Sequence, residues 1–148
     1  LIDAFGVGTA MGVSKDAPDC DGVYKLFELS NHGKLLPTMK LSKGKVTYPG
    51  KKQVYRITDK YEKYIKDILA LRDEKINGQR LLTKVMENGK IVCKMPSLEE
   101  IRETTKENLS KLPDNYKKLR NAAKYEVEIN SGLRKLTLNL NKSLKEKI

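Results

Sequence analysis

The sequence predicts a mixed fold of the α/β class, which as an isolated fragment would count as α+β. Between residues 23 and 93, short apolar or alternating runs separated by turn residues predict strands. A capping box beginning at Ser97 predicts a helix, and a leucine stripe after residue 130 predicts another. The 148 residues amount to one ordinary domain or to part of a larger one.

The first thirteen residues, LIDAFGVGTAMGV, are apolar and rich in glycine. This composition is typical of a buried strand that runs into a turn, and such a strand normally has neighbours on both sides. The chain starts at Leu1, without a Met, a charged leader or an apolar signal core. We therefore expect an excised segment, the tail of a bigger protein whose partner strands lie elsewhere.

Two strands and a turn are predicted next. The alternation in 23–29 predicts a strand, and Asn31-His32-Gly33 predicts a turn. The run 35–41 predicts a second strand, placed at an edge because Pro37 has no amide hydrogen to donate. Further turns are predicted at Lys43-Gly44 and Pro49-Gly50.

Residues 53–57 predict a short strand, whereas the stretch 61–71 is ambiguous. A helical face would collect Tyr61, Tyr64, Ile65, Ile68 and Leu69. The same stretch could instead pair as a strand with 53–57 after a turn at Asp59-Lys60. Periodicity alone slightly favours the helix.

Asparagine–glycine pairs mark two further turns, at Asn77-Gly78 and Asn88-Gly89. The second pair separates the runs 82–86 and 90–93. Because both residues of such a turn need positive φ angles, this pair predicts a hairpin.

The two helices have clear local signals. Ser97 and Glu100 form a capping box, and Pro113 marks the end of the first helix. The last helix is predicted to begin near Asn130-Ser131, with lysines near its C-terminus. We interpret the apolar stripes of both helices as packing faces; they comprise Leu98, Ile101, Thr105, Leu109 and Leu112 in one, and Leu133, Leu136, Leu140 and Leu144 in the other.

Charge and composition exclude several classes of protein. The formal net charge is +11, although residues 1–30 hold two lysines against five carboxylates. The excess lysines are scattered, and nucleic-acid binding is disfavoured because no arginine-rich stripe or base-stacking aromatic motif occurs. No run of eighteen apolar residues exists, so we expect no membrane-spanning helix. Cys20 and Cys93 lack metal-ligand spacing and are predicted to be reduced thiols of a cytoplasmic protein.

The glycine-rich turn Gly6-Val7-Gly8-Thr9 is the one candidate site for chemistry. Successive amides at the end of an apolar strand can surround a phosphate, and the Thr9 hydroxyl adds a donor. The turn is neither a Walker loop nor a full dinucleotide fingerprint, and on this motif alone a tight turn without a ligand is favoured over phosphate binding.

Two other features are interpreted as surface turns without a chemical role. His32 is interpreted as a surface turn residue, because no metal site or catalytic triad can be assembled around it. The basic segment 48–53 could contact a phosphate, but a solvated turn is the default. No acid–base pair for catalysis can be proposed, and no metal ligand set is present.

Several strings, taken in order, resemble nicotinate phosphoribosyltransferase. They are IDAFGVGT, SKDAP, GVYKL, KLS, PGKKQVYR, LLTKVMENGKIV, PSLEEIR and YEVEI, which together run along nearly the whole chain. The combination of GVGT, GVYKL and PGKKQVYR is specific to that family, and the match is to its C-terminal portion.

The resemblance implies a reaction and a fold. Family members join nicotinate to 5-phosphoribosyl-1-diphosphate, with ATP hydrolysis, giving nicotinate mononucleotide and diphosphate in NAD salvage. The implied fold is a type II phosphoribosyltransferase: residues 1–30 would end an irregular α/β barrel, 31–95 would form a β-rich segment, and 96–148 a helical one. Gly6, Val7 and Gly8 would then bind the sugar 5-phosphate, and Thr9 the phosphoribosyl donor.

The resemblance also implies what lies outside this chain. ATP and Mg²⁺ would be bound by the whole enzyme and not by this fragment, and the whole enzyme would be a homodimer. The family's catalytic His and nicotinate-binding Arg precede the GVGT strand, so no residue here is assigned a catalytic role and we expect the fragment to be inactive alone. Gly12 and Asp21 depart from the family pattern beside the loop.

The resemblance also decides the ambiguous stretch, because the matching family segment pairs with the PGKKQVYR strand. We therefore expect a strand at 61–71, against the helical count. Two alternatives remain open: a basic module that binds nucleic acid, and an adaptor domain without a ligand.

Overall fold

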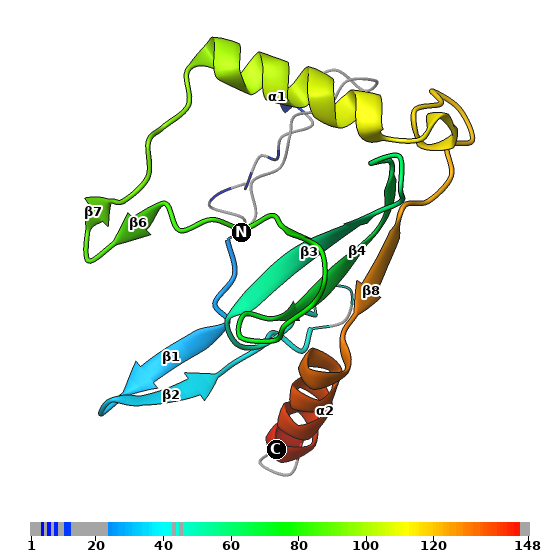
Figure 1. The fold of residues 1–148 in the computed structure, drawn as a ribbon. Helices are drawn as coiled ribbons and strands as arrows, with labels where there is room; N and C mark the ends of the chain where they lie inside the picture. The colour runs from blue at the N-terminus through cyan, green and yellow to red at the C-terminus, as the bar shows by residue number, and fades with distance from the viewer. Residues whose placement is uncertain are drawn as a thin grey trace.

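The computed structural model describes residues 24–42, 44 and 46–145, together with the single positions 4, 6, 8, 11 and 12. Within these residues a four-stranded sheet lies between two helices, and two separate hairpins project to one side (Figure 1). The predicted mixed α/β class is confirmed at this level. None of the helices among the described residues is long and apolar enough to cross a membrane.

The central sheet has the strand order β5-β3-β4-β8. Strand β3 (Lys52–Thr58) pairs antiparallel with β4 (Tyr64–Leu71) and, at its other edge, with the short β5 (Gln79–Arg80). Strand β8 (Glu126–Ile129) pairs parallel with β4. Strand β4 therefore meets its neighbour in the chain, β3, on one side and the distant β8 on the other.

Strand β4 confirms the strand that the resemblance predicted within residues 61–71 and shows that the helical periodicity was misleading. The preceding turn is held by the Asp59 carboxylate, whose Oδ1 accepts from the amides of Tyr61 (2.8 Å) and Lys63 (2.9 Å). Along β4, Ile68, Leu69 and Ala70 are all at least half-buried, because both faces of this central strand are partly covered. A strand of this kind loses the simple alternation by which a sequence identifies it.

Both predicted hairpin turns are confirmed, but their strands are short. His32 (φ 47°) and Gly33 (φ 76°) connect β1 (Glu28–Asn31) to β2 (Lys34–Pro37). Asn88 (φ 49°) and Gly89 (φ 74°) connect β6 (Met86–Glu87) to β7 (Lys90–Ile91). Positive φ at both turn residues matches the twist of antiparallel strands.

The predicted strand limits were wrong in these hairpins. Residues 24–27 lie outside any strand, and β2 ends at Pro37 instead of residue 41. The runs 82–86 and 90–93 contribute only two strand residues each. Each hairpin forms a two-stranded sheet of its own, so no third strand extends the pairing.

Helix α1 (Leu98–Lys111) begins at the predicted capping box, since the Ser97 hydroxyl accepts from the Glu100 amide and the Glu100 carboxylate accepts from the Ser97 amide. A single 3₁₀ turn, Asp114–Tyr116, follows. Helix α2 (Ser131–Lys145) ends the described chain, and its Leu133 is fully buried. The helices lie at opposite ends of the sheet (Figure 1).

The packing role predicted for the apolar stripes holds for α2 but is wrong for α1 among the described residues. No α1 residue is buried, and Leu98, Ile101 and Leu109 keep about half of their surface. The helix touches the sheet through its C-terminal half, where the Tyr64 hydroxyl donates to Asn108 Oδ1 (2.6 Å). Among the described residues, the N-terminal half therefore makes no contact that buries its stripe.

Most of the buried residues in the described part of the chain lie along β3, β4 and the start of α2, whereas Met39, Pro49 and Gly50 lie outside these elements. The fully or nearly fully buried apolar side chains are Met39, Tyr55, Tyr64, Ala70 and Leu133. Glu74 connects these elements: its Oε2 accepts from the Leu71 amide and its Oε1 from Asn130 Nδ2, both at 2.7 Å. The carboxylate thus joins the end of β4 to the residue before α2.

Candidate functional site

The predicted phosphate loop is described at two of its four positions. Gly6 and Gly8 are exposed, and a Cβ added at either would meet no atom within 4 Å. The Met11 amide donates to the Gly8 carbonyl (3.3 Å). Val7 and Thr9 lie outside the described residues, so phosphate binding by this loop stays a prediction.

The structure places His32 where the sequence predicted, in the exposed β1–β2 turn. Cys93 is a free, half-buried thiol, while Cys20 lies outside the described residues. In the part of the chain that the structure describes, no three His, Cys, Asp or Glu side chains converge as metal ligands would.

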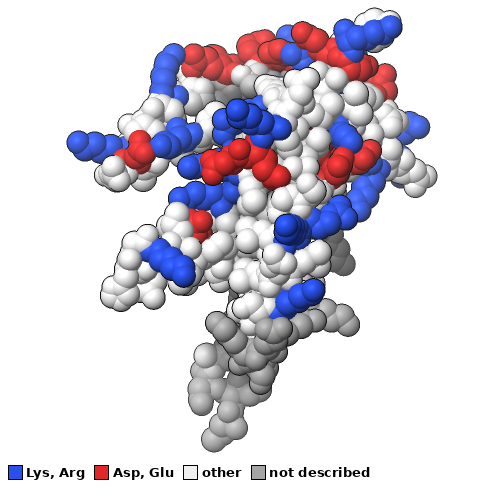
Figure 2. All heavy atoms as spheres, turned by 60° about the horizontal axis from the view of Figure 1, so that its bottom comes forward, with Lys and Arg blue, Asp and Glu red and all other residues white. Residues whose placement is uncertain are grey.

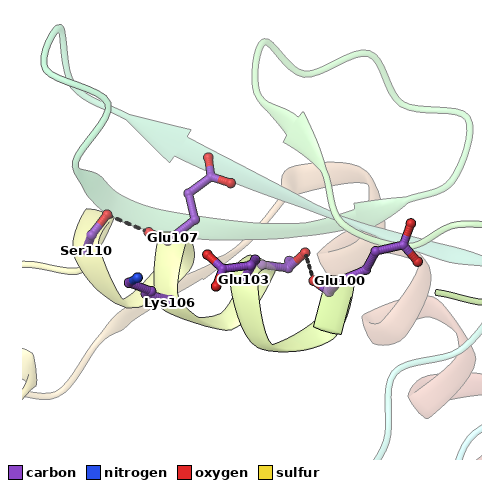
Figure 3. A pocket seen from close by; sticks show the side chains of 6 residues that line it. Glu100, Glu103, Lys106, Glu107 and Ser110 are labelled. Carbon is purple, nitrogen blue, oxygen red and sulfur yellow. Dashed lines mark hydrogen bonds between the residues drawn. The ribbon is translucent and has the colours of Figure 1, made fainter. Parts of the chain in front are cut away.

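The outer face of α1 forms an open surface groove (Figure 3). Glu100, Glu103, Lys106 and Glu107 project from it as separate side chains. Hydrogen bonds from Ser97 and Lys94 lower the pKa of Glu100, and a hydrogen bond from Lys111 lowers the pKa of Glu107. Both carboxylates are therefore ionised at neutral pH, and neither is suited to general acid catalysis there.

A polar cluster that the sequence reasoning missed lies between the sheet and α1. Arg56 on β3 faces Asp67 on β4, and its Nε and Nη2 donate to the two carboxylate oxygens, each at 2.9 Å. The guanidinium lies over the Tyr64 ring, 4.3 Å from its centroid. Tyr125 adds a hydroxyl that donates to Asp67 Oδ1 at 3.2 Å.

The electrostatics of this cluster indicate a structural role. The hydrogen bonds to Asp67 raise the pKa of Arg56, and burial together with Asp67 raises the pKa of Tyr125 to about 12. Both groups keep their protons near neutral pH. The cluster borders a groove of about 390 Å³ whose other walls include Leu109 and Leu112 of the α1 region. The cluster thus connects β3, β4 and the segment that leads into β8.

The basic segment 48–53, assigned by default to a solvated turn, is largely packed. Pro49, Gly50 and Gln53 are buried, and Gly50 has a φ of 74°. Its amide donates to the Phe27 carbonyl (2.8 Å). The prediction of a solvated turn was wrong because Leu71 and Leu136 approach Gly50, a tertiary contact that the local sequence does not show.

Comparisons with known proteins agree with one another. Residues 77–137 match the family model described as the nicotinate phosphoribosyltransferase C-terminal domain. The nicotinate phosphoribosyltransferase of Bacillus subtilis is 30% identical over 86% of this chain and 31% of its own length. The pncB2 nicotinate phosphoribosyltransferase of Mycobacterium tuberculosis is 36% identical over 80% of this chain and 25% of its own length.

The fold comparison agrees at a coarser level. The crystal structure of human nicotinic acid phosphoribosyltransferase aligns with a TM-score of 0.62 and 24% identity, over 73% of this chain and 26% of that one. The chain thus spans between a quarter and a third of the proteins that it matches. The resemblance predicted from the sequence is confirmed.

Proposed function

We propose that this chain, which matches the C-terminal part of nicotinate phosphoribosyltransferases, serves in such an enzyme. The reaction would join nicotinate to 5-phosphoribosyl-1-diphosphate, giving nicotinate mononucleotide and diphosphate with ATP hydrolysis. The observation that carries the proposal is the agreement of a family model with relatives from distant organisms that cover 80% or more of the chain. The enzyme would act in the cytoplasm in NAD salvage.

Within this enzyme the loop at residues 6–9 would bind the 5-phosphate of the sugar. The open space around Gly6 and Gly8 supports this role, since a phosphate can approach a backbone that carries no side chain. Thr9 would contact the phosphoribosyl donor through its hydroxyl. In the implied barrel this loop stands at the C-terminal end of a strand, the usual end for phosphate sites.

Other parts of the enzyme would supply the remaining chemistry. The catalytic His, the nicotinate-binding Arg, and the sites for ATP and Mg²⁺ are assigned to the portion of the enzyme that this chain does not match. Exposed apolar residues on α1 and on the β1–β2 hairpin, such as Leu29, Leu35 and Ile101, support a covering partner of this kind. A homodimer is part of the same proposal.

Full-length protein with Thr9→Ala tests the loop assignment. Loss of a charge-assisted hydrogen bond should raise the KM for 5-phosphoribosyl-1-diphosphate about tenfold. Thr104→Ala is the matched control, since its hydroxyl on exposed α1 donates only to the Glu100 carbonyl. Equal KM values for wild type and Thr9→Ala would remove the loop from the donor site, and absence of nicotinate mononucleotide formation by the wild type would refute the proposed reaction.

The nucleic-acid alternative receives no comparable support. On the face shown in Figure 2, basic side chains are interspersed with acidic ones and do not form one continuous positive surface. Acidic side chains gather along the edge of that view where α1 lies.

A further inference from the structure

A cavity of about 590 Å³ opens beside the start of β3, away from the predicted loop. Its walls come from the residue before β1, the start of β3 and the residue before it, the turn after β4, and β5 with the segment that follows it. The residues that the argument uses are Phe27, Lys51, Lys52, Arg72, Arg80 and Lys84. A volume of this size suits a small organic molecule.

The charge of these walls is one-sided. Among the described residues that line the cavity, five are basic and none is acidic. Lys51 has a carboxylate partner in Glu28 (3.3 Å), and Lys84 has one in Glu87 (2.6 Å). Arg72 lies 3.7 Å from the almost fully exposed Asp73.

Two of the five cations have no such partner. Arg80 and Lys52 have no carboxylate within 4 Å in the described part of the chain. The Lys52 ammonium donates to the Tyr48 and Gly50 carbonyls and lies 4.6 Å from the centroid of the Phe27 ring. Its burial lowers its pKa despite the nearby Glu28.

The walls are fixed before any ligand arrives. Buried Gln53 bonds both backbone groups of Leu82: its Nε2 donates to the carbonyl (2.9 Å) and its Oε1 accepts from the amide (2.8 Å). The Arg72 amide donates to the Lys51 carbonyl (2.9 Å). Because these walls are already ordered, the entropic cost of binding an anion is reduced.

From these observations we infer that the cavity binds a small organic phosphate, with the phosphate held by Arg80 and the neighbouring basic groups. Several cations converging on one fixed cavity favour a phosphate over a singly charged carboxylate. Phe27 and Leu82 offer apolar surface to the rest of the ligand. This site shares no residue with the loop at residues 6–9, so it goes beyond the proposed function.

Titration calorimetry on the full-length protein tests the site with adenosine 5′-monophosphate, ribose 5-phosphate, inorganic phosphate and uncharged adenosine. Thr9→Ala is used as the background, so that binding at the predicted loop is weakened. The phosphate esters should bind and adenosine should not. Tighter binding of the nucleotide would identify a nucleotide as the ligand, whereas equal or tighter binding of ribose 5-phosphate would identify a sugar phosphate.

Substitutions then locate the binding. Arg80→Ala and Lys84→Ala should each weaken binding of the phosphate esters about tenfold. Arg80→Lys should retain most of the affinity, and Lys106→Ala on the far side of α1 should leave it unchanged. Circular dichroism confirms that each variant is folded.

Three results would overturn the inference. These are no binding of either ester at millimolar concentration, equal affinities of Arg80→Ala, Lys84→Ala and the background protein, and much tighter binding of a single-stranded oligonucleotide that depends on the same residues. Loss of transferase activity in Thr9→Ala with phosphate binding intact would keep the two proposals separate.

Discussion

The ion pair between Arg56 and Asp67 should contribute measurably to the stability of the central sheet. Their side chains keep 22% and 12% of their surface, so the pair lies between a surface pair and a buried one. Exposed pairs contribute at most about 1 kcal/mol, and breaking a fully buried pair costs about 3–5 kcal/mol. The bidentate geometry and partial burial place the coupling energy at about 2 kcal/mol, discounted for solvent screening.

A double-mutant cycle isolates this coupling. Arg56→Ala, Asp67→Ala and the double variant are compared by hydrogen exchange of β4 and β8 amides in the full-length protein. A coupling of about 2 kcal/mol corresponds to a roughly 30-fold effect on the opening equilibrium. Asp67→Ala alone should cost about 1 kcal/mol more than Arg56→Ala, because the Tyr125 hydroxyl also loses its acceptor.

The matched control is the pair Lys66 and Glu128, which joins β4 to β8 at 2.6 Å but is more exposed. The same cycle on this pair should give a clearly smaller coupling. If the Arg56–Asp67 coupling fell within error of zero, or below that of the control, the argument from burial and bidentate geometry would be refuted.

Three further changes test local parts of the structure. Ser97→Ala should destabilise α1 by about 1 kcal/mol, seen as faster amide exchange in its first turn only, and unchanged exchange there would contradict the capping role. Tyr125 has a pKa raised to about 12, so its contribution to stability is complete below pH 10 and is lost as the pH rises from about 10 to about 12. An absorbance titration should therefore show a late-ionising tyrosine absorbance that Tyr125→Phe removes; a high-pH titration curve that this substitution leaves unchanged would contradict the assignment. Gly78→Ala should displace β5 from β3, because the new Cβ would lie 2.9 Å from the Arg56 carbonyl oxygen; denaturation midpoints equal to those of the wild type would exclude that clash.

Features set by short stretches of sequence were predicted well. The turns at Gly33 and Gly89 need positive φ, and the capping box at Ser97 needs only residues three positions apart. The start of α2 near Ser131 followed from the same kind of local signal. Each of these depends on neighbouring residues alone, which the sequence displays directly.

Features that depend on distant contacts were missed. Periodicity left residues 61–71 ambiguous and slightly favoured a helix, because pairing on two sides buries consecutive residues of β4; the strand was predicted from the family likeness alone. The basic cavity is lined by residues that lie between Phe27 and Lys84 in the sequence, and no local sequence pattern predicts that they meet. The loop at residues 6–9 and the division into segments 1–30, 31–95 and 96–148 stay predictions.

The parallel pairing of β8 with β4 has a consequence for how the protein is made. Lys66 and Glu128, which meet across these strands, are 62 positions apart. During synthesis β3 and β4 can pair as soon as they leave the ribosome, but the second edge of β4 stays open until the nascent chain has delivered β8. During that interval the unpaired edge of β4 can pair with a strand of another chain.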